Sequence, residues 1–257
     1  LWKQELVSKI VSFVNPDLNF FDKGITKEEF EASEIFNHGI LSSEDTIEGI
    51  VDGSKVSISE CNVRSRSKSS NSRAAIEYKN VQIHTGSKKS SDIESHVLFY
   101  GLFLQLELSN ITISSPLKII PARRTHIEDK FGIKITSQSY ITDLKVLNSD
   151  DRIDLPSSSD AYNVYCTNKE EAKAILTPKF IKVIDFIYSK FEKIEVIMSI
   201  NKGMFYMAIS WNQDMFETDL FLKNNIIESG LANKFHQDII FINQVITEVG
   251  LINKTGT

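Results

Sequence analysis

Two cysteines in 257 residues leave little material for a disulfide framework or a cysteine-based metal site. Cys61 and Cys166 lie far apart, each in an apolar, strand-like segment, so we expect buried free thiols, with a disulfide as the less favoured alternative. The five histidines never pair at a metal-ligand spacing, and even His236 and Asp238 would not share a face of a helix. No metal site is predicted.

Long apolar runs and strong charge of one sign are also missing. The stretch Leu102–Leu108 is interrupted by Gln105 and Glu107 and falls short of the roughly 18 apolar residues of a membrane span. The formal charge of −5 is mild, which argues against a dedicated nucleic-acid binder. The first residue is Leu1 rather than Met, and no signal sequence follows it, so we expect a fragment of a longer protein.

Catalytic motifs are scarce: the sequence has no Gly-x-Ser-x-Gly elbow, no phosphate loop and no dinucleotide fingerprint. No catalytic residue and no cofactor is therefore predicted. The weak candidates are the carboxylates Glu44, Asp45 and Glu60, which could serve acid–base chemistry or hold a cation. The alternative for Glu44 and Asp45, which we favour, is charge at the start of a helix. The acidic run 150–154 is interpreted as a solvated linker.

A basic, serine-rich loop over 64–73 is the one distinctive charged segment. Its four cations are Arg64, Arg66, Lys68 and Arg73. Near an anionic membrane surface each would add about 1 kcal/mol of binding. A flexible, solvated loop is the favoured alternative.

The first half of the chain combines two helices with strands. Apolar spacing predicts a helix over 2–14, and Thr26 with Glu29 predicts a short helix with a capping box. From about Glu44 to Leu147 the pattern indicates strands, including a hairpin that turns at Asp52-Gly53.

The second half begins after a Ser- and Asp-rich linker at 149–160. A strand at 162–166, a helix that starts at Thr177-Pro178, a hairpin over 194–211 and a final helix over 233–249 follow. The predicted fold is α+β, with mostly antiparallel sheets in two halves and flanking helices. The predicted units are residues 1–148 and 161–257. The helix after Thr177 is expected to pack Phe180 against the hairpin.

Four segments occur in the order and spacing of one protein family. They are Ser33–Phe36, the run from Glu44 to Glu60, the strand Gly101–Phe103, and Tyr165 through Thr177-Pro178. They resemble the bacterial membrane-protein family catalogued as domain of unknown function 3137, over roughly Asn15 to Glu217. The last helix lies beyond this resemblance. Family members resemble one another in having a membrane-spanning region before the soluble portion, and no catalytic residues are carried over.

These observations favour a non-enzymatic binding or scaffolding module of a membrane-anchored bacterial protein. The resemblance implies a soluble portion held at the inner membrane, and the expected free thiols place it on the cytoplasmic side. An anionic membrane surface or another membrane protein is the expected partner, and nucleic acid is not. The alternative is a hydrolase that uses Glu44, Asp45 or Glu60 in a cleft between the two halves.

Overall fold

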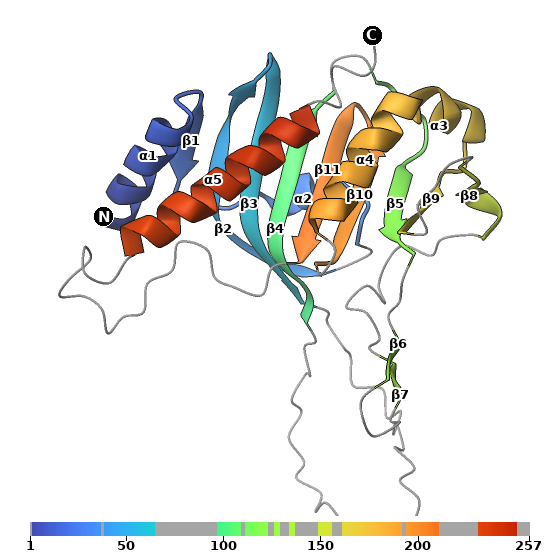
Figure 1. The fold of residues 1–257 in the computed structure, drawn as a ribbon, viewed down its shortest axis with the longest axis horizontal. Helices are drawn as coiled ribbons and strands as arrows, with labels where there is room; N and C mark the ends of the chain where they lie inside the picture. Colours follow the sequence, from blue (N-terminus) through green and yellow to red (C-terminus); the bar gives the residue numbers. More distant parts are fainter. Residues whose placement is uncertain are drawn as a thin grey trace, which may run out of the picture.

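The fold is α+β, as predicted, and is built on one large antiparallel sheet with helices on both faces (Figure 1). The computed structural model describes residues 2–36, 39–64, 97–108, 111–122, 126–128, 134–136, 149–155, 161–191, 194–210 and 231–250. Nine strands form the sheet in the order β1-β2-β3-β4-β11-β10-β5-β9-β8, and each neighbouring pair is antiparallel. A separate two-stranded sheet pairs β6 with β7.

The strands vary in length, and the longest lie in the first half of the chain. Their bounds are β1 Leu18–Phe21, β2 Ile40–Val51, β3 Ser54–Arg64, β4 Val97–Glu107, β5 Leu117–Pro121, β6 His126–Glu128, β7 Lys134–Thr136, β8 Arg152–Ile153, β9 Tyr162–Tyr165, β10 Val196–Asn201 and β11 Met204–Ser210. The predicted β2–β3 hairpin is confirmed: Asp52 and Gly53 form its turn with φ of 53° and 81°. The β10–β11 hairpin turns in the same way at Lys202-Gly203.

Strands from both predicted halves alternate within the sheet. Strand β4 pairs with β11, and β5 lies between β10 and β9. The segment predicted as a linker contributes a 3-10 turn, Ser149–Asp151, and the edge strand β8, which pairs with β9. The two segments therefore share one sheet instead of meeting only at residues 149–160.

Three longer helices cover one face of the sheet. They are α1 (Trp2–Val14), α4 (Pro178–Lys190) and α5 (Leu231–Gly250), and the shorter α3 (Lys169–Ile175) precedes α4. Figure 1 shows α5 and α4 crossing this face. Thr177 caps α4, accepting a hydrogen bond from the Phe180 amide, and Pro178 occupies the first turn as predicted. Phe180 is fully buried in the same apolar cluster as Met198 and Phe205 of the hairpin.

The opposite face carries only one described helix, the short α2 (Lys27–Glu31). Its capping box between Thr26 and Glu29 is confirmed. Phe30 of α2 packs on Phe103 of β4, with ring centroids 4.9 Å apart, and Phe36 stacks on Phe30. The Asn201 side-chain amide donates to the Ala32 carbonyl at 2.9 Å, which ties the end of α2 to β10. A short helix thus covers part of a wide sheet face and leaves its neighbourhood open for a site.

Candidate functional site

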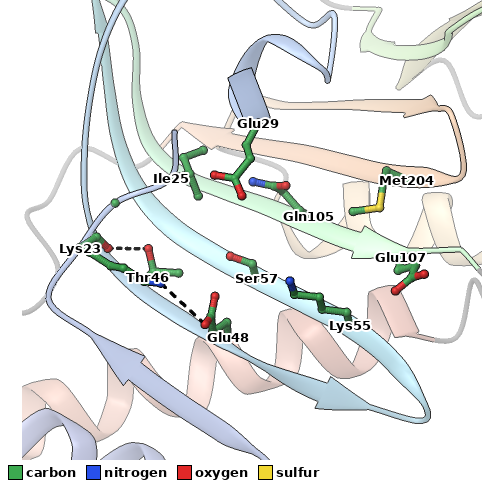
Figure 2. A pocket seen from close by; sticks show the side chains of 11 residues that line it. Lys23, Ile25, Glu29, Thr46, Glu48, Lys55, Ser57, Gln105, Glu107 and Met204 are labelled. Carbon is green, nitrogen blue, oxygen red and sulfur yellow. Dashed lines mark hydrogen bonds and ion pairs between the residues drawn. The ribbon is translucent and has the colours of Figure 1, made fainter. Parts of the chain in front are cut away.

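A polar pocket of about 250 Å³ lies beside α2, on the sheet face opposite α4 and α5 (Figure 2). The loop from β1 to α2 and α2 itself form one wall, and strands β2, β3, β4 and β11 form the floor. We call it the α2 pocket; its lining residues are Lys23, Gly24, Ile25, Glu29, Thr46, Glu48, Lys55, Ser57, Gln105, Glu107 and Met204. At about 30 Å³ per water molecule, it has room for about eight waters or a small polar ligand.

The floor belongs to a row of polar residues that crosses the whole sheet. Residues directly opposite each other in antiparallel strands share a face, so paired positions can be followed from strand to strand. One such row takes one residue from each strand: Asn19, Glu48, Ser57, Gln105, Tyr206, Ser199, Lys118, Tyr165 and Arg152. The next row on this face is apolar at its centre, with Phe103, Ala208 and Ile197. The α2 pocket therefore opens over the polar row at Glu48, Ser57 and Gln105.

Gln105 is the most unusual group in the α2 pocket. It is only 9% exposed, yet its side-chain amide forms no hydrogen bond within the described part of the chain. The amide atoms of Gln105 are not among the side-chain atoms that are shut off from solvent without a partner, so the residual exposure of this residue lies at the pocket. Figure 2 shows this amide extending toward Glu29 inside the pocket. A ligand with hydrogen-bonding groups would satisfy it.

Glu29 is held over the pocket by the cap of α2. Its Oε2 accepts hydrogen bonds from the Thr26 amide at 2.7 Å and the Thr26 hydroxyl at 3.0 Å. Burial raises the pKa of Tyr206, and the Glu29 carboxylate adds to that rise. The negative charge of Glu29 therefore acts on Tyr206, the strand partner of Gln105, and Figure 2 shows the Glu29 carboxylate beside the Gln105 amide.

The loop wall is fixed by Thr46 and by a charge pair. The Thr46 hydroxyl donates to the Lys23 carbonyl at 2.6 Å, so the 2.7 Å contact with Ser59 has the serine as donor. The Lys23 ammonium lies 4.0 Å from Glu48 Oε1. Gly24 has no room for a side chain, because a Cβ there would overlap the Ser43 backbone. This wall is packed closely against β2.

The three carboxylates predicted from the sequence lie close together, but outside the α2 pocket. Glu44 and Glu60 are directly paired across β2 and β3, and Asp45 occupies a β-bulge between Glu44 and Thr46 with a φ of 51°. Glu44 and Asp45 are therefore in a strand, which corrects their interpretation as the start of a helix. Glu44 is exposed, whereas Asp45 and Glu60 are buried, and Glu60 accepts a 2.8 Å hydrogen bond from the Tyr100 hydroxyl.

The basic segment and the cysteines are the remaining features that the sequence singled out. Arg64 is exposed at the end of β3, whereas Arg66, Lys68 and Arg73 lie outside the described residues. Both cysteines are free and buried. Within the described ranges, no three His, Cys, Asp or Glu side chains are grouped to hold a metal ion, and no helix is long and apolar enough to cross a membrane.

Sequence reasoning missed Gln105, although the sequence contained a signal for it. Strand β4 is apolar on both faces over most of its length, and Gln105 is a buried polar residue two positions before its end. A central strand normally has no reason to bury an amide side chain. The same interruption of the apolar run that argues against a membrane span therefore also marks a buried polar position.

Comparison with known proteins identifies a matching protein family and a similar solved structure. Residues 97–251 match the family described as "Protein of unknown function (DUF3137)". This range includes α5, which corrects the expectation that the last helix lies beyond the resemblance. No curated protein matches the chain. A crystal structure of the mycobacterial trehalose monomycolate transport factor A, TtfA, is similar with 9% identity and a TM-score of 0.41, covering 93% of this chain and 94% of that one.

Proposed function

The chain belongs to the DUF3137 family of proteins of unknown function, and we propose that its folded domain is a non-catalytic binding module whose ligand occupies the α2 pocket. The observation that carries this proposal is Gln105: a nine-tenths buried residue whose side-chain amide is directed into a polar cavity and forms no hydrogen bond within the described residues. Stability alone would favour an apolar side chain at this position. Retaining an amide there is understandable if a ligand completes its hydrogen bonds.

Two neighbouring groups support the same proposal. Ser57 is paired directly with Gln105 across β3 and β4, and Lys55 follows on the same face of β3, about 7 Å along the strand. Neither side chain forms a hydrogen bond or ion pair within the described part of the chain. Three polar groups that form no side-chain hydrogen bond within the described residues therefore lie side by side on the pocket floor, where a small molecule could bind all three.

The test is a binding screen against the full 257-residue chain by two-dimensional amide NMR. The probes are 4-aminobutyrate, butyrate, butylamine and glucose, each at millimolar concentration. We expect at least one probe to shift the backbone amides of Ser57 and Gln105 and the Gln105 side-chain NH₂. The variant Gln105→Leu should weaken that binding at least tenfold while leaving the remaining spectrum folded. If none of the four classes shifts these signals, the binding proposal fails.

We also propose that the module forms part of a membrane-anchored bacterial protein and faces the cytoplasm. The resemblance and the basic segment that begins at Arg64 support this setting. The exposed Arg64 lies in register between Ile40 and Val97, which are 46% and 36% exposed. A cation flanked by exposed aliphatic side chains suits the boundary of an anionic lipid surface.

A further inference from the structure

The α2 pocket presents both signs of charge to whatever it binds, and this limits the chemistry of the ligand. Five of its lining residues are charged: Lys23, Lys55, Glu29, Glu48 and Glu107. Lys23 and Glu48 form a pair at 4.0 Å and largely offset each other. The groups left to act on a ligand are the Lys55 ammonium on the floor and the Glu29 carboxylate on the helix wall. Glu107 adds negative charge at the β11 side of the pocket (Figure 2).

A ligand with a single sign of charge fits this arrangement poorly. A simple anion could bind Lys55 and Ser57, but it would lie in a small cavity beside Glu29 and Glu107. A simple cation could bind Glu29, but it would lie beside Lys55. Like charges brought together in a partly desolvated site repel strongly. Each single-charge ligand therefore meets at least one like charge, which a ligand carrying both charges can avoid.

A neutral sugar or polyol fits less well for a different reason. Binding would remove water from Lys55 and Glu29 without giving either group an opposite charge. The apolar surfaces of the lining are Ile25 and Met204, which are aliphatic, so the lining has no aromatic face on which a sugar ring could stack. The charged groups, rather than the apolar ones, determine what the pocket favours.

We infer that the α2 pocket binds a small zwitterion, a molecule with a carboxylate at one end and an ammonium group at the other; this inference rests on the binding function proposed above. The carboxylate lies against Lys55 and the Ser57 hydroxyl. The ammonium group lies against Glu29 Oε1. Gln105 lies between the two ends, where its NH₂ donates to the carboxylate and its carbonyl accepts from the ammonium group.

The structure prepares Glu29 for this role. Its Oε2 is held by the Thr26 cap, so the carboxylate needs little reorganisation when a cation arrives at Oε1. The Thr26 cap links ligand binding to the position of α2, because the same carboxylate belongs to both. Substitution of Glu29 by Gln keeps the capping box, since Gln also serves at this helix position, but removes the charge.

The experiment compares matched probes that share one carbon chain. Amide NMR titration of the full chain with 4-aminobutyrate, butyrate and butylamine gives three dissociation constants. We expect 4-aminobutyrate to bind at least tenfold more tightly than either single-charge probe. Repeating the titration with glycine and 6-aminohexanoate should show an optimum chain length, set by the distance between Lys55 and Glu29.

Two variants then separate the two ends of the ligand. Lys55→Met should reduce 4-aminobutyrate binding at least tenfold, and Glu29→Gln should do the same. The matched controls are Lys27→Met and Glu31→Gln, which remove an exposed ion pair on α2 outside the pocket and should leave binding unchanged. Unchanged melting temperatures in all four variants would show that any loss comes from the site.

The outcomes distinguish this inference from the proposed function. If butyrate, butylamine or glucose shifts the Ser57 and Gln105 amides as strongly as 4-aminobutyrate, the binding function stands and the zwitterion inference is overturned. The inference is likewise overturned if Lys55→Met binds 4-aminobutyrate normally. If no probe shifts these amides, both proposals fall.

Discussion

At the scale of single residues, the substitution Gln105→Leu should affect stability and binding in opposite ways: it should stabilise the fold and weaken ligand binding. Gln105 is 9% exposed and its amide forms no hydrogen bond within the described residues, so replacement by Leu loses no such bond and adds apolar surface; we expect the free energy of unfolding to rise by about 1 kcal/mol. In a chain of this length that corresponds to about 2–4 °C in melting temperature. Thermal and urea denaturation of the ligand-free protein measure the change.

Ser59→Ala is the matched control for that prediction. Ser59 lies on the same sheet face and is also buried, but its hydroxyl donates to Thr46. Removing a satisfied hydroxyl should lower the free energy of unfolding by about 1 kcal/mol. A destabilised Gln105→Leu variant would mean that the amide supports the fold, and the case for a ligand at Gln105 would lose its basis.

Cys61 should make the fold sensitive to alkaline pH. Burial raises the pKa of its thiol from 9.0 to about 12, with a smaller rise from the neighbouring Glu60 that opposes the lowering by the Ser43 hydroxyl. Because the folded pKa is the higher one, the thiol stabilises the fold fully below pH 9, and this stabilisation is lost as pH rises toward 12. At pH 10 the loss is about 1.4 kcal/mol.

The measurement is a pair of urea titrations at pH 7 and pH 10, on the native protein and on Cys61→Ala. The variant lacks the ionisable thiol, so the difference in stability between the two proteins should shrink by about 1.4 kcal/mol at the higher pH. Buried tyrosines with raised pKa, such as Tyr188, affect both proteins equally. An unchanged difference would show that the Cys61 thiol does not titrate in this way.

At the scale of elements, α4 is held to the sheet by its buried side. Phe180 is 0% exposed, so Phe180→Ala should lower the free energy of unfolding by about 3–5 kcal/mol through lost burial and the cavity left behind. Phe186 on the same helix is 36% exposed and provides a matched substitution that should cost less than about 1 kcal/mol. Chemical denaturation of both variants tests this. Equal costs would contradict the orientation of α4.

Local sequence signals predicted the helix caps because a cap depends on residues within one turn. Thr26 with Glu29 and Thr177 with Pro178 carry all the groups that the cap requires, and both were confirmed. The bulge at Asp45 could not be found in this way. Its positive φ depends on how Glu44 and Thr46 pair with the neighbouring strand, which a charge pattern along one strand does not reveal.

At the scale of the whole molecule, strand pairing between distant segments was beyond sequence reasoning. The antiparallel class followed from short turns, but β4 pairs with β11 across about 100 residues, and no local pattern marks that partner. The α2 pocket depends on this pairing, because Gln105 and Glu107 of β4 and Met204 of β11 line it together although they lie far apart in the chain. The polar residues of the site can therefore be seen in the sequence, but the sequence does not reveal which of them are neighbours in the folded protein.

The last prediction concerns the proposed docking of the domain at a membrane. The full chain should bind vesicles of anionic phospholipid at low salt and lose that binding as ionic strength rises, because exposed charges are screened within about 10 Å at 0.1 M salt. Each cation of the basic segment contributes about 1 kcal/mol near such a surface. Neutralising the four of them together should abolish binding; they are Arg64, Arg66, Lys68 and Arg73.

The control must change the overall charge equally while leaving the basic segment intact. Four exposed lysines on α3 and α4 serve this purpose: Lys169, Lys173, Lys182 and Lys190. If net charge alone governed vesicle binding, their replacement by Gln would weaken it as much as the change at the basic segment. We expect co-sedimentation to fall sharply only for the basic-segment variant, because Arg64 lies beside the exposed Ile40 and Val97, which can enter the lipid boundary together with it. Equal losses, or no sedimentation of the native chain at low salt, would rule out docking through these ends of strands β2, β3 and β4.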